Sequence, residues 1–111
     1  MTVTVQNIIP RKQVEAATTT QYTSTNCKTI IDKFTVTNTT AGAVTFTAYL
    51  VASGGTASAE EMIIQTKSIA PGECYLCPEM VGQTMESGGF IATAASAGTS
   101  LTLSASGRQI T

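Results

Sequence analysis

Histidine and tryptophan are both absent from the 111-residue sequence, and charged residues make up only 12% of it. Without histidine the chain has no Ser-His-Asp triad, no Cys-His dyad and no imidazole ligand for a metal ion. Without a cluster of Lys and Arg it has no basic surface for nucleic acid, so we expect no nucleic-acid partner. The net charge is −1, and so neutral a surface resists self-association poorly.

Long apolar runs are missing as well. No stretch approaches the ~18 apolar residues that span a bilayer, so we expect no membrane segment. The first ten residues, MTVTVQNIIP, lack the charged start and apolar stretch of a signal peptide. We therefore expect the protein to be made and folded in a reducing cytoplasm. With three cysteines, at least one thiol stays unpaired within the chain.

Threonine is abundant, and several short segments alternate apolar with polar residues. Two runs, 30–38 and 44–51, have the period of two that marks a half-buried strand. Ile30, Phe34 and Val36 are predicted to share one face of the first run. The intervening TTAGA favours a tight connection, so we predict a hairpin.

Further strands are predicted at 62–69, 74–77, 90–95 and 101–106, with Gly107 breaking or bulging the last one. The N-terminal TVTV also reads as a strand, which Pro10 is expected to end. Seven to nine short strands at roughly 8–12-residue spacing predict an all-β antiparallel sandwich of jelly-roll type. We expect one domain over 1–111, with a partly irregular arm at 1–28 and the sandwich core at 29–111.

The segment GECYLCPE places Cys74 and Cys77 in a C-x-x-C spacing, which redox dithiols and half of many zinc sites share. Here the motif follows a Pro-Gly turn, and an extended CYLC would point the two thiols to opposite faces. Cys27 is the third cysteine, and a tetrahedral zinc site needs four ligands. We expect packing roles and no cofactor or metal; a redox or metal protein using all three cysteines is the alternative.

No phosphate-binding glycine motif is present, and Glu60-Glu61 is the one adjacent carboxylate pair. Two distant carboxylates can serve a glycosidase, but a small sandwich without tryptophan makes a weak sugar cleft. We therefore expect no enzymatic activity and no small-molecule substrate. Tyr49, predicted on an outward strand face, keeps a carbohydrate- or receptor-binding module as an alternative.

Three segments together carry a resemblance to a known class of proteins. They are IIDKFTVTNTTAGAVTFTAYLVASGG, IAPGECYLCPEMVGQTMESGGFIATAAS and LTLSASGRQIT. This succession of hairpin-like run, Gly/Ser loop, Pro-Gly turn and two closing strands resembles small structural proteins of tailed bacteriophages. The resemblance covers about residues 29–111, and Gly88-Gly89-Phe90 departs from it where that class has Gly-Asp.

The resemblance implies a non-enzymatic virion protein that decorates or cements the capsid as a homo-oligomer, a trimer or a dimer. A collar, fibre or tail-adaptor component at the head–tail neck is the alternative. Its partners would be further copies of itself and the phage major capsid or neck proteins. We expect TVTV to add to a neighbour's sheet edge, against the alternative of an ordinary edge strand. The predicted intersubunit contacts are Thr2, Val3, Thr4, Val5, Ile8 and Ile9.

Overall fold

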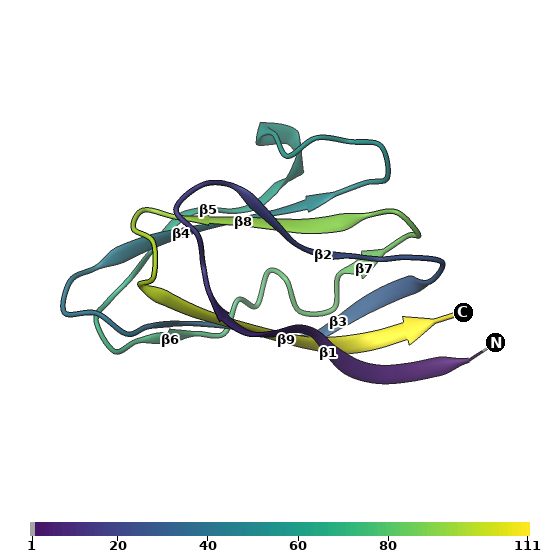
Figure 1. Cartoon of the computed structure of the whole chain (residues 1–111), viewed down its shortest axis with the longest axis horizontal. Coiled ribbons are helices and arrows are strands. Elements are labelled where there is room, and N and C mark those ends of the chain that lie inside the picture. Colours follow the sequence, from purple (N-terminus) through teal and green to yellow (C-terminus); the bar gives the residue numbers. More distant parts are fainter. Residues whose placement is uncertain (1) are drawn as a thin grey trace.

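The structure, a computed structural model, describes residues 2–111 and consists of two packed antiparallel β-sheets (Figure 1). The predicted all-β sandwich is confirmed. The elements are β1 (Val3–Gln13), β2 (Thr19–Thr23), β3 (Lys28–Asn38), β4 (Val44–Val51), the short 3-10 turn η1 (Ala59–Glu61), β5 (Met62–Ile69), β6 (Cys74–Tyr75), β7 (Thr84–Met85), β8 (Phe90–Ala95) and β9 (Leu101–Ile110).

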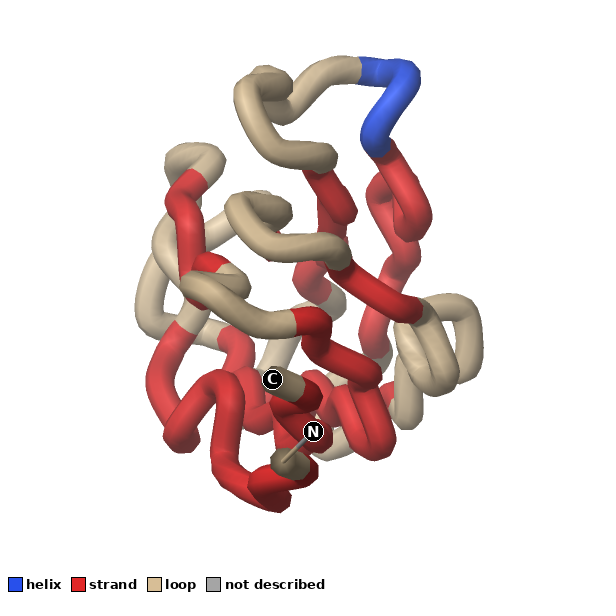
Figure 2. The backbone as a smooth tube through the Cα atoms, turned by 90° about the vertical axis from the view of Figure 1, so that its right-hand side faces the viewer, coloured by secondary structure: helices blue, strands red, loops and turns tan. Residues whose placement is uncertain are grey.

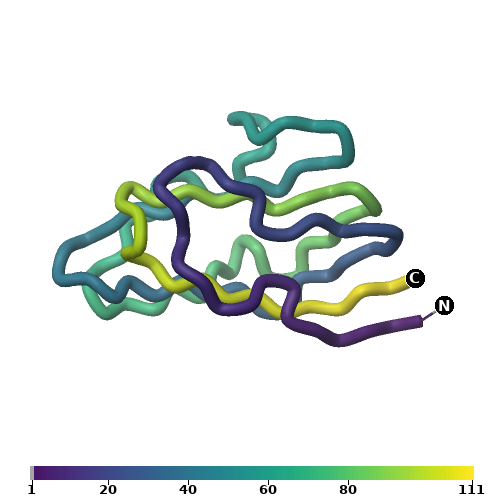
Figure 3. Tube along the Cα trace, in the orientation of Figure 1, coloured from purple at the N-terminus to yellow at the C-terminus, as the bar shows by residue number. Residues whose placement is uncertain are grey.

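Sheet A has the order β1-β9-β3-β6, with β7 also paired to β3, and sheet B has the order β2-β8-β4-β5. Strands from the first half of the chain pair with strands from the second half in a nested order. The pairs are β1–β9, β2–β8, β3–β6 and β4–β5. This nesting is the arrangement of a jelly roll, a long hairpin rolled into two facing sheets. Figure 2 shows the two layers from the end at which both termini lie, and Figure 3 shows the first and last segments running side by side.

The core lies between the sheets and is built from aliphatic side chains around two aromatic rings. Phe34 of sheet A contacts Phe46 of sheet B, with ring centroids 6.4 Å apart. Leu101 and Leu103 of β9 and Ile91 of β8 are fully buried beside them. Along β9 and the second half of β3, alternation sends these residues inward and leaves half-buried threonines and serines between them on the outer face.

The predicted hairpin between 30–38 and 44–51 is wrong, although both strands exist. β3 belongs to sheet A and β4 to sheet B, so the connection crosses the sandwich. The side chain of Asn38 holds this crossing: its Nδ2 donates to the carbonyl oxygens of Gly42 at 2.8 Å and Ile69 at 2.9 Å. Period-2 alternation is satisfied equally by strands that pair and by strands that face each other across a core, so the pattern did not distinguish them.

The predicted inward face of β3 is corrected by one residue. Ile31, Phe34 and Val36 are fully buried, whereas Ile30 is half-buried on the opposite face. The register with β9 shifts between Ile31 and Lys33. This irregularity inserts one extra residue into β3. Residues before it therefore point to the opposite side of the sheet from the side that simple alternation predicts.

The N-terminal 28 residues supply two strands of the sandwich and part of its core. β1 continues through Pro10 to Gln13, so the prediction that Pro10 ends the strand is wrong. Proline is tolerated there because β1 is an outer strand, and its register with β9 shifts on either side of Ile9. Ile8, Ile9 and Val14 pack into the core, so the proposed division at residue 28 does not follow the packing.

Candidate interaction surface

The predicted intersubunit residues of β1 divide into two groups. Thr2, Val3, Thr4 and Val5 are exposed, and the side chains of Val3 and Val5 keep 50% and 75% of their surface accessible. Ile8 and Ile9 are 4% and 1% exposed and belong to the core cluster. The prediction that these two isoleucines contact a neighbour is therefore wrong, because the irregular register of β1 on either side of Ile9 places both side chains in the core.

Hydrogen bonding between β1 and β9 fixes the direction of each backbone group. Thr2 and Thr111 exchange two N–H···O bonds, each 2.9 Å long. Val3 pairs next with Ile110, and Val5 with Arg108. Antiparallel ladders alternate hydrogen-bonded and non-hydrogen-bonded pairs. The N–H and C=O groups of Val3 and Val5 therefore point away from β9, toward the open edge of sheet A.

Side chains across sheet A form a row on its outer face, the face directed away from sheet B. Val5 lies opposite Arg108, which lies opposite Ile30, and residues directly opposite each other share a face. The guanidinium of Arg108 donates to the Asp32 carboxylate from both Nε and Nη2, at 3.0 to 3.2 Å. The Asp32 carboxylate raises the pKa of Arg108 by hydrogen bonding and by charge.

The segment between β6 and β7 adds apolar residues next to this row. Leu76 and Val81 are 57% and 44% exposed, and they are the remaining exposed large apolar side chains of residues 2–111 beside Val3 and Val5. With Pro78, Lys33 and Asp32 they line an open depression of about 340 Å³. The sequence analysis did not predict that Leu76 and Val81 are exposed. They lie between β6 and β7 in a segment without regular strand structure, where alternation does not indicate which side chains are exposed.

The predicted CYLC strand is present only at Cys74 and Tyr75. Cys77 has a left-handed backbone, with φ of 46°, so the chain turns there rather than staying extended. Cys74 is exposed, whereas Cys77 is fully buried. Burial, and to a lesser extent the charges of Glu79 and Cys74, raise the pKa of the Cys77 thiol to about 12, which opposes thiolate chemistry at neutral pH.

Cys27 lies elsewhere in the fold, next to Ser24 and Thr29, whose hydroxyl oxygens are 2.9 Å apart. All three cysteines are free. Within residues 2–111 no three Cys, Asp or Glu side chains are placed to share a metal ion. The structure therefore does not bring the three cysteines together as the redox or metal alternative requires.

The three tyrosines are all half-buried, and two use their hydroxyl groups within the chain. The Tyr22 hydroxyl lies 2.8 Å from the Thr29 hydroxyl and accepts a bond from Gln109. The Tyr75 hydroxyl donates to Glu79, and burial raises the pKa of Tyr75 well above its ordinary value, reinforced by that carboxylate. None of them stands out as an exposed platform for a sugar ring.

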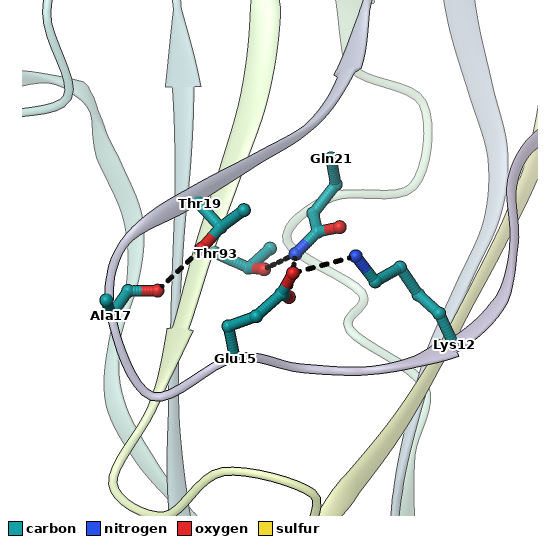
Figure 4. Close-up of polar contacts among 6 residues, drawn as sticks. All are labelled: Lys12, Glu15, Ala17, Thr19, Gln21 and Thr93. Atoms are coloured by element: carbon teal, nitrogen blue, oxygen red, sulfur yellow. Dashed lines mark hydrogen bonds and ion pairs between the residues drawn. The ribbon is translucent and has the colours of Figure 1, made fainter.

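A polar cluster fastens the connection from β1 to β2 onto sheet B (Figure 4). The Gln21 side-chain amide donates to Glu15 at 3.0 Å and to the buried Thr93 hydroxyl at 2.9 Å. Lys12 forms an ion pair with the other Glu15 oxygen at 3.0 Å. These bonds, that from Gln21 first, lower the pKa of Glu15. The Oε1 oxygen of Gln21 is buried and has no hydrogen-bond partner among the described residues.

Comparison of the chain with protein-family models, with curated proteins and with solved structures found no match. The part of the chain that the structure describes contains no helix long and apolar enough to cross a membrane. The described residues form a jelly-roll domain with an open edge at β1. Exposed apolar side chains lie near both edges of sheet A, and the Arg108–Asp32 ion pair lies between them.

Proposed function

We propose that this chain is a non-enzymatic structural protein of a bacteriophage virion that binds the capsid surface as a decoration or cement protein, in a homo-oligomer. The observation that carries the proposal is the open depression beside β3 that the exposed side chains of Leu76 and Val81 line together with Pro78. Apolar side chains gathered on one face mark interaction sites, whereas singly scattered ones do not.

Three further observations support the class of partner. The jelly roll is a frequent fold of viral capsid domains, although fold alone does not set function. Residues 29–111 resemble small structural proteins of tailed bacteriophages. A charged fraction of 12% also suits close packing between protein surfaces, and many weak contacts on a lattice add up through avidity.

The proposal is tested by sedimenting the purified protein with assembled capsids of the phage that encodes it and counting the bound copies. We expect co-sedimentation with a copy number in the hundreds, as a lattice requires. About a dozen copies or fewer would instead place the protein at the symmetric head–tail neck. A protein that stays in the supernatant would contradict both locations.

The outer face is tested by changing its apolar residues. Leu76→Asp combined with Val81→Asp should abolish capsid binding, because two charges would enter an apolar contact. Both side chains are exposed, so the variant should keep its fold. Ser68→Asp, at an exposed position of β5 in sheet B, is the matched control and should bind as the unchanged protein does. Undiminished binding by the double variant would exclude this face.

A further inference from the structure

In the part of the chain that the structure describes, the two sheets have five outer strands, and four of them are guarded against pairing with another chain. β6 and β7 are each only two residues long. β5 carries the charge of Lys67 and a left-handed residue, Thr66, with φ of 42°. β2 has an irregularity between Thr20 and Tyr22. Short length, charge and bulges are the usual means of protecting a sheet edge.

β1 lacks these protections over its first half. Residues 2–9 contain no charged side chain, and pairing with β9 is regular from Val3 to Gln6. The backbone N–H and C=O groups of Val3 and Val5 point outward along this stretch, beside side chains that are 50% and 75% exposed. The edge therefore offers both unpaired backbone groups and apolar surface at the same two residues.

We propose that β1 pairs antiparallel with β1 of a second copy of this chain, about a twofold axis at Thr4. In this register Val3 faces Val5 of the second copy, and Val5 faces its Val3. Each of these two pairs exchanges two backbone hydrogen bonds, so every outward group of both valines is satisfied. The four valine side chains meet on the outer face of the joined sheet, next to the half-buried Ile110 of each copy.

A second copy fits this edge because the edge is complementary to itself. A twofold axis places each residue near its own counterpart, so a charged strand would meet like charges, and β1 has none before Arg11. The inference deepens the homo-oligomer part of the proposed function. Its test needs no capsid, so a failure to dimerise and a failure to bind capsids are distinguishable.

The oligomeric state is measured by light scattering over a range of protein concentrations. The mass should reach twice the chain mass of 11.5 kDa. At concentrations at which the unchanged protein is dimeric, the Val5→Lys variant should keep the mass of a single chain. The twofold axis would bring the two lysines of the dimer close together, and their like charges would repel. Ser68→Lys, on β5, is the control and should dimerise. A monomeric unchanged protein, or a dimer unaffected by Val5→Lys, would overturn the proposal.

The register is tested by a disulfide across the axis. In a Cys74→Ser background, which removes the exposed thiol, Thr4→Cys should give a covalent dimer under mild oxidation. Non-hydrogen-bonded antiparallel pairs have Cα atoms about 4.5 Å apart, within the ~4.4–6.8 Å span of disulfides. Ser68→Cys in the same background should stay monomeric on a non-reducing gel. Cross-linking by Val5→Cys in place of Thr4→Cys would overturn this register.

Discussion

At the scale of single residues, Gly107 occupies a position of sheet A at which there is no room for a side chain. At Gly107 a Cβ atom would collide with the carbonyl oxygen of Ile30 on the neighbouring strand. That oxygen belongs to the backbone of a central strand of sheet A, so it has little freedom to move. The sequence predicted a break or bulge at this glycine, and the close approach of β3 gives the reason for its small size.

We expect Gly107→Ala to lower the free energy of unfolding by about 1–3 kcal/mol, the usual cost of overpacking. Urea denaturation followed by circular dichroism measures the change. Gly42→Ala is the matched control, because no atom lies within 4 Å of its Cβ position, and its effect should stay within about 0.5 kcal/mol. Equal unfolding midpoints for the two variants would contradict the steric argument.

We expect the protein to lose stability at alkaline pH, because the thiol of Cys77 is buried. Burial raises its pKa from 9.0 to about 12, so the unfolded chain releases this proton first as the pH rises. The free energy of unfolding should therefore fall between pH 9 and 12, by at most about 1.4 kcal/mol per pH unit from this group. Stability is measured by urea denaturation at several pH values.

Cys77→Ala should show a shallower alkaline decline than the unchanged protein. Some decline remains, because the pKa of Tyr75 is raised as well. Cys74→Ala, at an exposed position, serves as the control and should keep most of the slope, because burial is the largest cause of the raised Cys77 pKa. The argument fails if Cys77→Ala declines as steeply as Cys74→Ala.

At the scale of elements, the existence of most strands followed from the sequence, and their pairing did not. The predicted ranges 44–51, 62–69 and 90–95 agree with β4, β5 and β8. The hairpin was wrong because alternation records only which residues turn inward. Whether β3 pairs with β4 or faces it depends on β8 and β9, which lie far away in the sequence.

The β1–β2 connection is expected to weaken in acid. Its cluster lowers the pKa of Glu15 from 4.5, so the folded chain holds this carboxylate charged more readily than the unfolded chain does. The resulting stabilisation is present above pH 4.5 and is lost as the pH falls. The free energy of unfolding of the unchanged protein should decline as the pH falls below 4.5.

Glu15→Gln removes the titrating group and should decline less over that range, measured by urea denaturation at each pH. Glu60→Gln, in the exposed η1 turn, is the control and should follow the unchanged protein. If Glu15→Gln and Glu60→Gln lose stability in parallel, the cluster has no part in the acid response.

For the whole molecule, the jelly roll makes the first strand a partner of the last. We expect residues 29–111 alone not to fold, because they lack β1, β2 and the buried Ile8, Ile9 and Val14. Dispersion of amide signals in a two-dimensional NMR spectrum reports the outcome.

A circular permutant is the matched control, since it retains every strand. Thr2 and Thr111 are joined by two backbone hydrogen bonds, so a short linker can connect them while the chain is opened at Gly54–Gly55. This permutant should fold. A folded fragment of 29–111 would restore the predicted division at residue 28.

The sequence by itself determined the class of fold, because period-2 alternation and turn residues are local properties of the chain. It also predicted the strand at TVTV, the first part of β1. The tertiary structure decided the nesting of strands, the burial of Ile8 and Ile9, and the exposure of Leu76 and Val81. These depend on contacts between segments distant in sequence, and on irregularities of register that shift alternation by one residue.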